Sequence, residues 1–442
     1  MNLLRGRVAR GWLQCFQVLR GRVRYSWYTK AFPLRKVLSV LIRDVRPWGG
    51  QRSDVEVAGD RIVAVRPHDP AAAPGPDAVE GRGRLLFPSF SDVHVHLDST
   101  RIGLPFRPHT GAPGVWAMML NDRENWRNAE VPLPERVAGT LERMIANGTT
   151  RVRTYAQVDV DCQLEKLDAV LAAKERFAKH AEVEVMAFPQ AGILREPGTA
   201  DVLEASLRSG ASVVGGIDPC SLDKDPKGHL DVVFGLAEKY GVEVDIHLHE
   251  PGHLGVFSAD LVIERVRALD MRGKVTLSHA YELGSVSEAV SRRLIDTFAE
   301  LDIAMATVAP SVDRQLSLAE LTTSGVRVGL GEDGQRDYWS PYGNCDLLDR
   351  TWQLAFTHGF RRDELIEMAL AVATIGGASI MSHDVPRLAG IADRPGVAVG
   401  DRADLVLVDG ETPTSAVMDR GKDRTVLHDG VVVADGLAVV DL

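Results

Sequence analysis

Short apolar runs alternate with amphipathic stretches through the middle of this 442-residue chain. The runs have the length of strands buried on both faces, and the stretches between them repeat apolar residues at helical spacing. Because a predicted helix follows each run, the pattern favours an α/β fold with a parallel (β/α)8 TIM barrel over a doubly wound sheet. Eight runs fit, at residues 85–95, 150–158, 183–188, 212–217, 242–247, 274–278, 303–308 and 326–331.

The predicted helices each carry an apolar stripe along one side, as expected for helices that cover a sheet. Two of them begin at Asp346 and Asp363 and complete the outer ring, so the barrel is expected to span residues 88–384. The others lie at residues 135–147, 164–180, 201–209, 230–240, 260–269, 287–301 and 318–323.

The two ends of the chain show a different pattern, with short strands separated by turn residues. We therefore predict a small discontinuous β-sandwich domain built from residues 37–87 and 385–442. Its antiparallel strands are expected at residues 40–44, 55–57, 61–65, 400–409 and 424–433.

Residues 1–36 are set apart by their charge, with nine basic residues and no Asp or Glu. The apolar stretch from Trp12 to Leu19 is interrupted by two glutamines, which makes it a poor core for a secretory signal. We interpret this segment as a disordered extension, or as the result of a start placed too far upstream.

Composition narrows the range of partners. A formal charge of -10 argues against nucleic acid, and no apolar run approaches the length of a membrane span. The four cysteines are scattered without a Cys-x-x-Cys pair, which favours a reducing compartment and hence the cytoplasm. A small-molecule ligand is expected, and a homo-oligomer is compatible with the sequence.

Polar side chains follow several predicted strands, where the reactive residues of a TIM barrel gather. His94 and His96 are two residues apart, so both imidazoles project from one face of an extended strand. His247, His279 and Asp333 follow strands five, six and eight. Three imidazoles and a carboxylate suit zinc or ferrous iron, with a position left open for water. The plainer alternatives are a chance His-x-His pair and a buried core histidine at position 279.

Two residues next to these candidates are not expected to bind the metal. His249 is expected to be a hydrogen-bond partner rather than a ligand, and Glu332 a loop carboxylate. Asp333 is harder to explain structurally, because a carboxylate after the apolar run 326–330 would be costly to bury without a cation or hydrogen bonds.

Several motifs in order resemble the amidohydrolase superfamily: Pro88–Asp98, Val152–Thr154, Ala187–Ile193, Ile246–Glu250, Ser278-His279, Asp333 and Asp337–Gly343. Over about residues 40–440 the chain is similar to the branch that holds cytosine deaminase and N-isopropylammelide isopropylaminohydrolase. The resemblance implies a hydrolase of C–N bonds, a hydrolytic deaminase or aminohydrolase of a pyrimidine- or triazine-like heterocycle.

The resemblance also implies one divalent metal, Zn²⁺ or Fe²⁺, held by His94, His96, His247 and Asp333. No lysine stands at the end of the fourth predicted strand, so the bridging carbamate of two-metal relatives is not expected.

By the same resemblance, Asp333 would be the base, Glu250 the acid, and His279 the residue that positions the attacking water. The substrate would contact three further side chains, Gln190, Trp339 and Tyr155.

The chain departs from the pattern of this branch at Tyr155 and Gln157, where a His and an Asp are usual, and from cytosine deaminase at one further position. Where that enzyme has a second Asp directly after the ligand Asp, this chain has Gly334. We expect the glycine to leave space for a bulkier or N-alkylated amine and to make cytosine a poor substrate. Two alternatives stay open: a single-metal cyclic amide hydrolase, and an inactive barrel that acts as a binding module.

Overall fold

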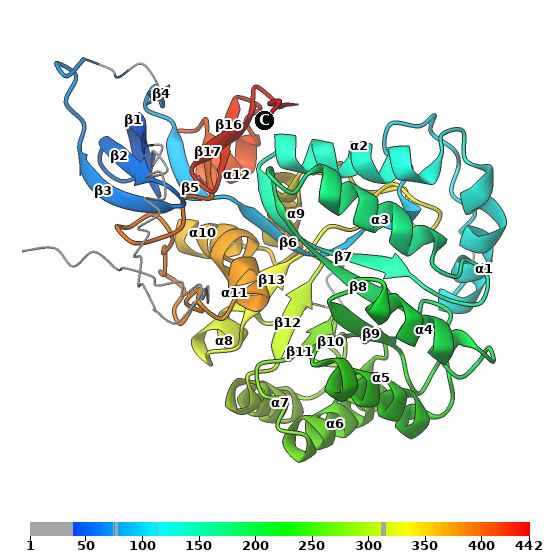
Figure 1. The fold of residues 1–442 in the computed structure, drawn as a ribbon. Helices are drawn as coiled ribbons and strands as arrows, with labels where there is room; N and C mark the ends of the chain where they lie inside the picture. The colour runs from blue at the N-terminus through cyan, green and yellow to red at the C-terminus, as the bar shows by residue number, and fades with distance from the viewer. Residues whose placement is uncertain (1–38, 74, 76–77, 112, 311–314) are drawn as a thin grey trace, which may run out of the picture. The chain divides into compact units, whose positions relative to one another are not determined.

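The computed structural model describes residues 39–73, 75, 78–111, 113–310 and 315–442, and the basic extension lies outside them. The described chain forms a barrel of parallel strands ringed by helices, with a second sheet built from both chain ends (Figure 1). This confirms the predicted fold class. The barrel strands are β6 (Phe90–His96), β7 (Thr149–Gln157), β8 (Glu182–Phe188), β9 (Val213–Ile217), β10 (Glu243–His247), β11 (Val275–Ser278), β12 (Ala304–Thr307), β13 (Val328–Leu330) and β14 (Asp333–Gly334).

The barrel closes through its last strand, which is interrupted by two residues. β13 pairs with β12, whereas β14 pairs with β6, the first barrel strand. Every residue of β6 and β7 is buried, as expected for parallel strands covered by helices. The ends of β6 and β14 therefore lie side by side, which brings the predicted ligands of the first and last strands together.

The helices around the barrel follow the apolar stripes in the sequence. Helix α5 shows how their ends are set, since the Asp225 side chain caps the first turn, Pro226 begins it, and Gly241 ends the helix with a φ of 68°. The helices are α1 (Val115–Asn125), α2 (Leu133–Ala146), α3 (Glu165–Arg176), α4 (Thr199–Arg208), α5 (Pro226–Tyr240), α6 (Gly252–Ala268), α7 (Glu288–Leu301), α8 (Leu318–Thr323), α9 (Leu347–Thr357), α10 (Asp363–Ala371) and α11 (Gly377–Met381), with short turns of helix at η1 (Leu97–Ser99), η2 (Trp126–Asn128) and η4 (Val372–Gly376).

The predicted strand at residues 85–95 is wrong in one respect, because the structure divides it between two sheets. β5 (Leu85–Pro88) pairs with β15 of the terminal sheet, whereas β6 begins the barrel. The chain crosses at Ser89, whose N–H donates to Asp404 O, while the next N–H, on Phe90, donates to Gly148 O. An uninterrupted apolar run carries no local signal for this change of partner.

The terminal sheet contains strands from both ends of the chain, as predicted. Its strands form one hydrogen-bonded path, and its two halves share a core that includes Ile42, Val55, Leu405 and Leu427. The members are β1 (Ser39–Pro47), β2 (Ser53–Ala58), β3 (Arg61–Pro67), β4 (Val79–Glu80), β5, β15 (Leu405–Val408), β16 (Arg424–His428), β17 (Val431–Asp435) and β18 (Ala438–Val439), with α12 (Pro413–Asp419) between β15 and β16.

One helical stretch corrects the expectation about apolar runs. Residues Asp363–Met381, which comprise α10, η4 and α11, are long and apolar enough to cross a membrane by length and composition alone. However, 83% of that window is buried inside the fold, and buried core helices pass the same test. The stretch is therefore weak evidence for a membrane span.

Candidate active site

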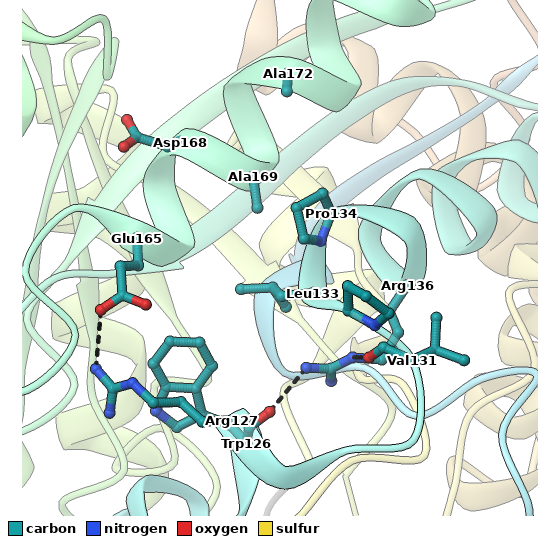
Figure 2. A pocket seen from close by; sticks show the side chains of 11 residues that line it. Trp126, Arg127, Val131, Leu133, Pro134, Arg136, Glu165, Asp168, Ala169 and Ala172 are labelled. Carbon is teal, nitrogen blue, oxygen red and sulfur yellow. Dashed lines mark hydrogen bonds and ion pairs between the residues drawn. The ribbon is translucent and has the colours of Figure 1, made fainter.

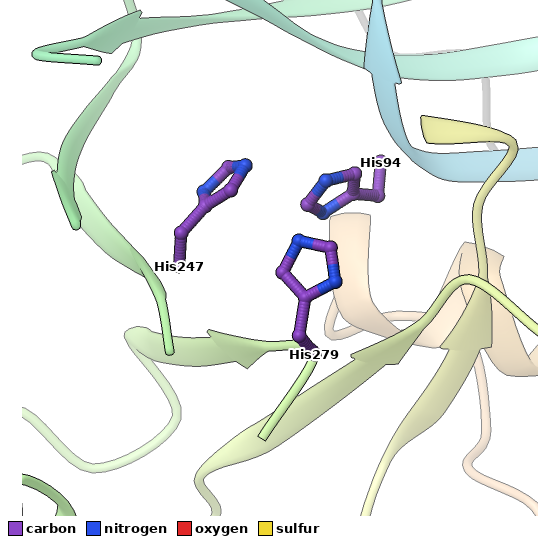
Figure 3. A group of neighbouring side chains, drawn as sticks. All are labelled: His94, His247 and His279. Carbon is purple, nitrogen blue, oxygen red and sulfur yellow. The ribbon is translucent and has the colours of Figure 1, made fainter. Parts of the chain in front are cut away.

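A cluster of imidazoles lies at the carboxyl ends of the barrel strands (Figure 3). His94 comes from β6, His247 from the end of β10, and His279 directly follows β11. The ring centre of His94 lies 4.5 Å from that of His247 and 4.6 Å from that of His279. The structure thus brings together histidines that are far apart in the sequence, because parallel strands end at one rim.

A carboxylate and a fourth imidazole complete the cluster. Asp333 Oδ1 lies 3.6 Å from His94 Nε2 and 3.4 Å from His96 Nε2. His96 Nε2 is in turn 3.4 Å from His247 Nε2. Ligand atoms bound tetrahedrally to zinc at about 2.0–2.1 Å would be roughly 3.3 Å apart, so these separations suit a single metal ion.

Unsatisfied nitrogens support the same interpretation. Both ring nitrogens of His94, Nδ1 of His247 and Nε2 of His279 are buried without a hydrogen-bond partner among the described residues. Buried polar atoms normally have partners, so this group of orphaned atoms is typical of a ligand-binding site. The predicted ligand residues therefore fit a divalent metal.

The protonation states are those that metal binding requires. Burial lowers the pKa of His94 to about 4, and burial also lowers the pKa of His247 well below its ordinary value. Burial acts to raise the pKa of Asp333, but the nearby imidazoles, His94 foremost, outweigh it and hold that pKa well below its usual range. Neutral imidazoles and an ionised carboxylate are the forms that bind metals.

Two of these residues have an unusual backbone conformation. His279 has a φ of 69° and Asp333 a φ of 61°, in the left-handed region that favours glycine. Such residues cost about 1–3 kcal/mol each and cluster at functional sites. The two strand ends accept this cost where they turn their side chains into the cluster.

Four members of the cluster line a cavity of about 490 Å³, which we call the barrel cavity: His96, His247, His279 and Asp333. His94 lies directly against His247 and His279. Phe188 forms part of its wall and stacks on His247 with ring centres 4.1 Å apart. Gln190 and Trp339, both predicted to contact the substrate, also line it, together with Val115 and Met118 from α1. A small planar molecule would therefore meet apolar walls with a few polar groups, as ligand cavities usually provide.

Glu250, the predicted acid, is not among the residues that line the barrel cavity. One of its carboxylate oxygens accepts the Ser221 N–H at 2.6 Å, and the other accepts the Ser258 hydroxyl at 2.5 Å. These two donors fix the buried carboxylate, and the role of Glu250 as the acid beside the substrate stays a prediction.

Tyr155, which was predicted to contact the substrate, is not among the residues that line the barrel cavity. The side chain is fully buried. Its hydroxyl donates to Asp245 Oδ2 at 3.0 Å and lies 3.0 Å from Ser278 Oγ. Its ring stacks on His96 with centres 5.0 Å apart. These contacts allow Tyr155 to position His96, and its contact with the substrate stays a prediction.

The expected space at Gly334 is also absent. A Cβ added there would overlap the carboxylate of Asp337, whose Cγ would be only 3.0 Å away. Asp337 is buried and lines the barrel cavity, whereas the sequence interpretation treated it only as part of a motif. A carboxylate therefore fills the position where the glycine was expected to leave room.

His249 lies on the cavity wall in an arrangement that the sequence suggested only in part. Its Nδ1 is 2.8 Å from Asp218 Oδ2, and its backbone N–H donates to Asp218 Oδ1 at 2.7 Å. Asp218 follows the apolar strand β9, so the reasoning that identified Asp333 could have found it.

A second cavity, of about 500 Å³, lies outside the barrel between α2 and α3 (Figure 2). Arg127 packs over Trp126 and bonds Glu165 at 3.1 Å, and Arg136 donates to Trp126 O at 3.0 Å. Because these polar groups are already paired, this cavity lacks the unsatisfied ligand atoms that distinguish the barrel cavity.

Comparisons with known proteins agree with this site. The chain is 36% identical to an N-isopropylammelide isopropylaminohydrolase from Burkholderia multivorans of known structure, with a TM-score of 0.82, covering 91% of this chain and 100% of that one. It is 27% identical to N-isopropylammelide isopropyl amidohydrolase from Pseudomonas sp. (strain ADP), over 88% of this chain and 94% of that protein. It is 26% identical to pterin deaminase from Rhizobium rhizogenes, over 87% of this chain and 88% of that protein.

A family model also matches most of the chain. The model described as "Amidohydrolase family" covers residues 119–434, which include His247, His279 and Asp333. The match spans more than half of the sequence, and the Burkholderia enzyme extends the likeness to the part that contains His94 and His96. The chain therefore belongs to the amidohydrolase family.

Proposed function

We propose that this protein is a metal-dependent hydrolase that releases ammonia or an amine from a nitrogen heterocycle and leaves the ring intact. The observation that carries the proposal is the cluster of His94, His96, His247, His279 and Asp333 at the barrel cavity, in which several buried ring nitrogens lack partners among the described residues. The related ammelide and pterin enzymes, by their names, act on heterocycles of this kind.

The ligand set would be His94, His96, His247 and Asp333. When bound, a divalent metal supplies Lewis-acid activation of water near neutral pH. Asp333 would accept the proton of the attacking water, because its carboxylate lies among the ligand atoms and faces the cavity. His279 would hold that water in place from the opposite strand end.

Proton delivery to the ring is assigned to His249 rather than to Glu250. A general acid must reach the substrate within hydrogen-bonding distance, and His249 lines the cavity whereas Glu250 does not. Asp218 orients the His249 imidazole, because its Oδ2 lies 2.8 Å from His249 Nδ1.

Substrate orientation would come from Gln190 and Trp339. The Gln190 amide can donate to a ring carbonyl or accept from a ring N–H. Trp339 adds apolar surface to the wall, and Phe188 and Met118 help to exclude water from the reacting carbon. The identity of the metal as zinc or iron, the cytoplasmic location and a homo-oligomeric state stay predictions.

A substrate screen tests the proposal. Purified protein loaded with zinc or ferrous iron would be incubated with amino-triazines, amino-pyrimidines and pterins, while released amine is quantified and the ring product is identified by mass spectrometry. We expect amine release with an intact ring, and loss of activity in an Asp333→Asn variant. Ring-opened products would support the cyclic amide hydrolase instead, and no product from metal-loaded protein would support a binding module.

A further inference from the structure

Asp337 is a buried carboxylate of the barrel cavity that neither the ligand set nor the proposed proton transfers use. It follows the ligand Asp333 by four residues, in the segment that leads from β14 to α9. Its donors among the described residues are two backbone N–H groups and one hydroxyl, and no cation.

The two oxygens of this carboxylate have different surroundings. Oδ1 accepts the backbone N–H groups of Trp339 and Ser340, both at 2.8 Å, and so closes a tight turn. Within the described part of the chain, Oδ2 accepts a hydrogen bond from the Ser99 hydroxyl alone, at 3.2 Å, and it lies against the position of a Cβ on Gly334. Ser99 and Gly334 both line the barrel cavity. One oxygen therefore maintains the turn, and the other lies at the cavity wall with capacity to accept a further hydrogen bond.

The same turn also carries a donor without a partner. Trp339 Nε1 is buried and finds no acceptor among the described residues, although Trp339 lines the barrel cavity. Leaving a buried acceptor and a buried donor incompletely satisfied is costly, unless a ligand pairs with them. An N–H next to a C=O, the edge of a lactam ring, has the complementary pattern.

We propose that Asp337 determines substrate specificity, by accepting a hydrogen bond at Oδ2 from a ring N–H of a lactam-containing heterocycle. This inference rests on the proposed function and names the class of substrate for the same cavity. It replaces the expectation of an open space at Gly334 with a requirement for an N–H donor at that place.

Substitution of Asp337 by Asn separates the two oxygens. The Asn carbonyl can still accept the N–H groups of Trp339 and Ser340, and its NH₂ group can donate to the Ser99 hydroxyl, so the turn is kept. At the cavity wall the substitution replaces an acceptor by a donor. The hydrogen bond from the ring N–H is lost and the buried N–H faces a donor instead, which corresponds to roughly tenfold or more in kcat/KM.

The test compares ammelide, whose ring carries N–H groups, with ammelides methylated at each ring nitrogen in turn. The wild-type protein should discriminate against one methyl isomer, and Asp337→Asn should lower kcat/KM on ammelide roughly tenfold or more and abolish that discrimination. Metal content and thermal unfolding should stay unchanged. An equal decrease on all probes, or no decrease, would overturn the inference.

A second variant keeps the test independent of the amide. Gly334→Ala should displace the Asp337 carboxylate and weaken the same discrimination, because the backbone at Gly334 is not left-handed and only space is limiting. Gly235→Ala is the matched control, since a Cβ there meets nothing within 4 Å. If the wild-type protein turns over none of the probes, the proposed function fails. Calorimetry then compares the binding of ammelide to the wild-type protein and to Asp337→Asn. Equal affinities would overturn the inference.

Discussion

His249 and Asp218 form an imidazole–carboxylate pair on the wall of the barrel cavity, with 2.8 Å between Nδ1 and Oδ2. Glu250 is the next residue after His249, and its carboxylate accepts hydrogen bonds from the Ser221 N–H and the Ser258 hydroxyl instead. Adjacent residues in the sequence thus have different hydrogen-bond partners.

From this relationship we predict that His249→Gln lowers kcat by roughly a hundredfold while the metal is retained, as expected when a general acid is lost. Glu250→Gln should lower kcat by less, because a glutamine can accept a hydrogen bond from the Ser221 N–H and donate one to the Ser258 hydroxyl. Steady-state kinetics on an active heterocycle, together with metal analysis, measure both effects. A larger loss in Glu250→Gln than in His249→Gln would return the acid role to Glu250.

Metal content should depend on the ligand residues. We expect about one metal per chain in the wild-type protein and substantial loss in His94→Ala, His247→Ala and Asp333→Ala, because each substitution removes a ligand. Elemental analysis after gel filtration checks this. His253→Ala, an exposed histidine on α6, is the control and should retain the metal. Normal metal content in all three ligand variants would refute the site.

His279 allows a separate prediction. If it positions water rather than binding the metal, His279→Ala should keep nearly one metal per chain and lose turnover. A parallel loss of metal would instead make His279 a ligand, which its closeness to His94 and His247 permits. Metal analysis and kinetics on the same preparation separate these outcomes.

Lys166 is a fully buried cation that connects three elements of the barrel. Its Nζ donates to Asp122 Oδ2 at 2.7 Å and to Gln157 Oε1 at 2.6 Å, and so links α3 to α1 and β7. Lys166→Met should destabilise the fold by roughly 3–5 kcal/mol, because it leaves the buried Asp122 charge unpaired.

Urea unfolding measures the Lys166 effect, and a double variant with Asp122→Leu should recover part of the loss. Lys239→Met is the control, since Lys239 is paired with Glu204 on the surface and such pairs contribute about 0–1 kcal/mol. Equal effects of Lys166→Met and Lys239→Met would contradict the prediction.

Glu282 should make stability depend on pH. Burial raises the pKa of its carboxyl to about 8, and neither oxygen has a hydrogen-bond partner among the described residues. The folded state therefore binds more protons than the unfolded state between the ordinary glutamate pKa and about pH 8. The contribution of Glu282 to the free energy of unfolding is therefore full below that window. It is lost as pH rises through the window, by at most about 1.4 kcal/mol per pH unit.

Glu282→Gln should flatten this dependence, because the amide does not titrate. The free energy of unfolding, measured by urea titration from pH 5 to pH 9, is the readout. An unchanged slope in the variant would show that other groups dominate the pH dependence.

The sequence by itself determined the architecture and the ligand cluster. Strand and helix periodicities are local properties, so most of β7 to β12 and their helices could be located from single apolar runs. His94, His96, His247, His279 and Asp333 could be grouped because the ends of parallel strands meet at one rim, whatever the details of packing. The change of sheet at Ser89 gave no such signal, because β5 and β6 are both wholly buried and read as one run.

Only the tertiary structure decided which polar groups reach the cavity. Glu250 and His249 are neighbours in the chain, but Glu250 is bonded to Ser221 and Ser258, whereas His249 is paired with Asp218 and lines the cavity. Gly334 appeared to leave space, but Asp337 fills it because a turn closed by Trp339 and Ser340 folds the carboxylate back. Side-chain direction and loop path depend on partners distant in sequence, and periodicity contains no information about them.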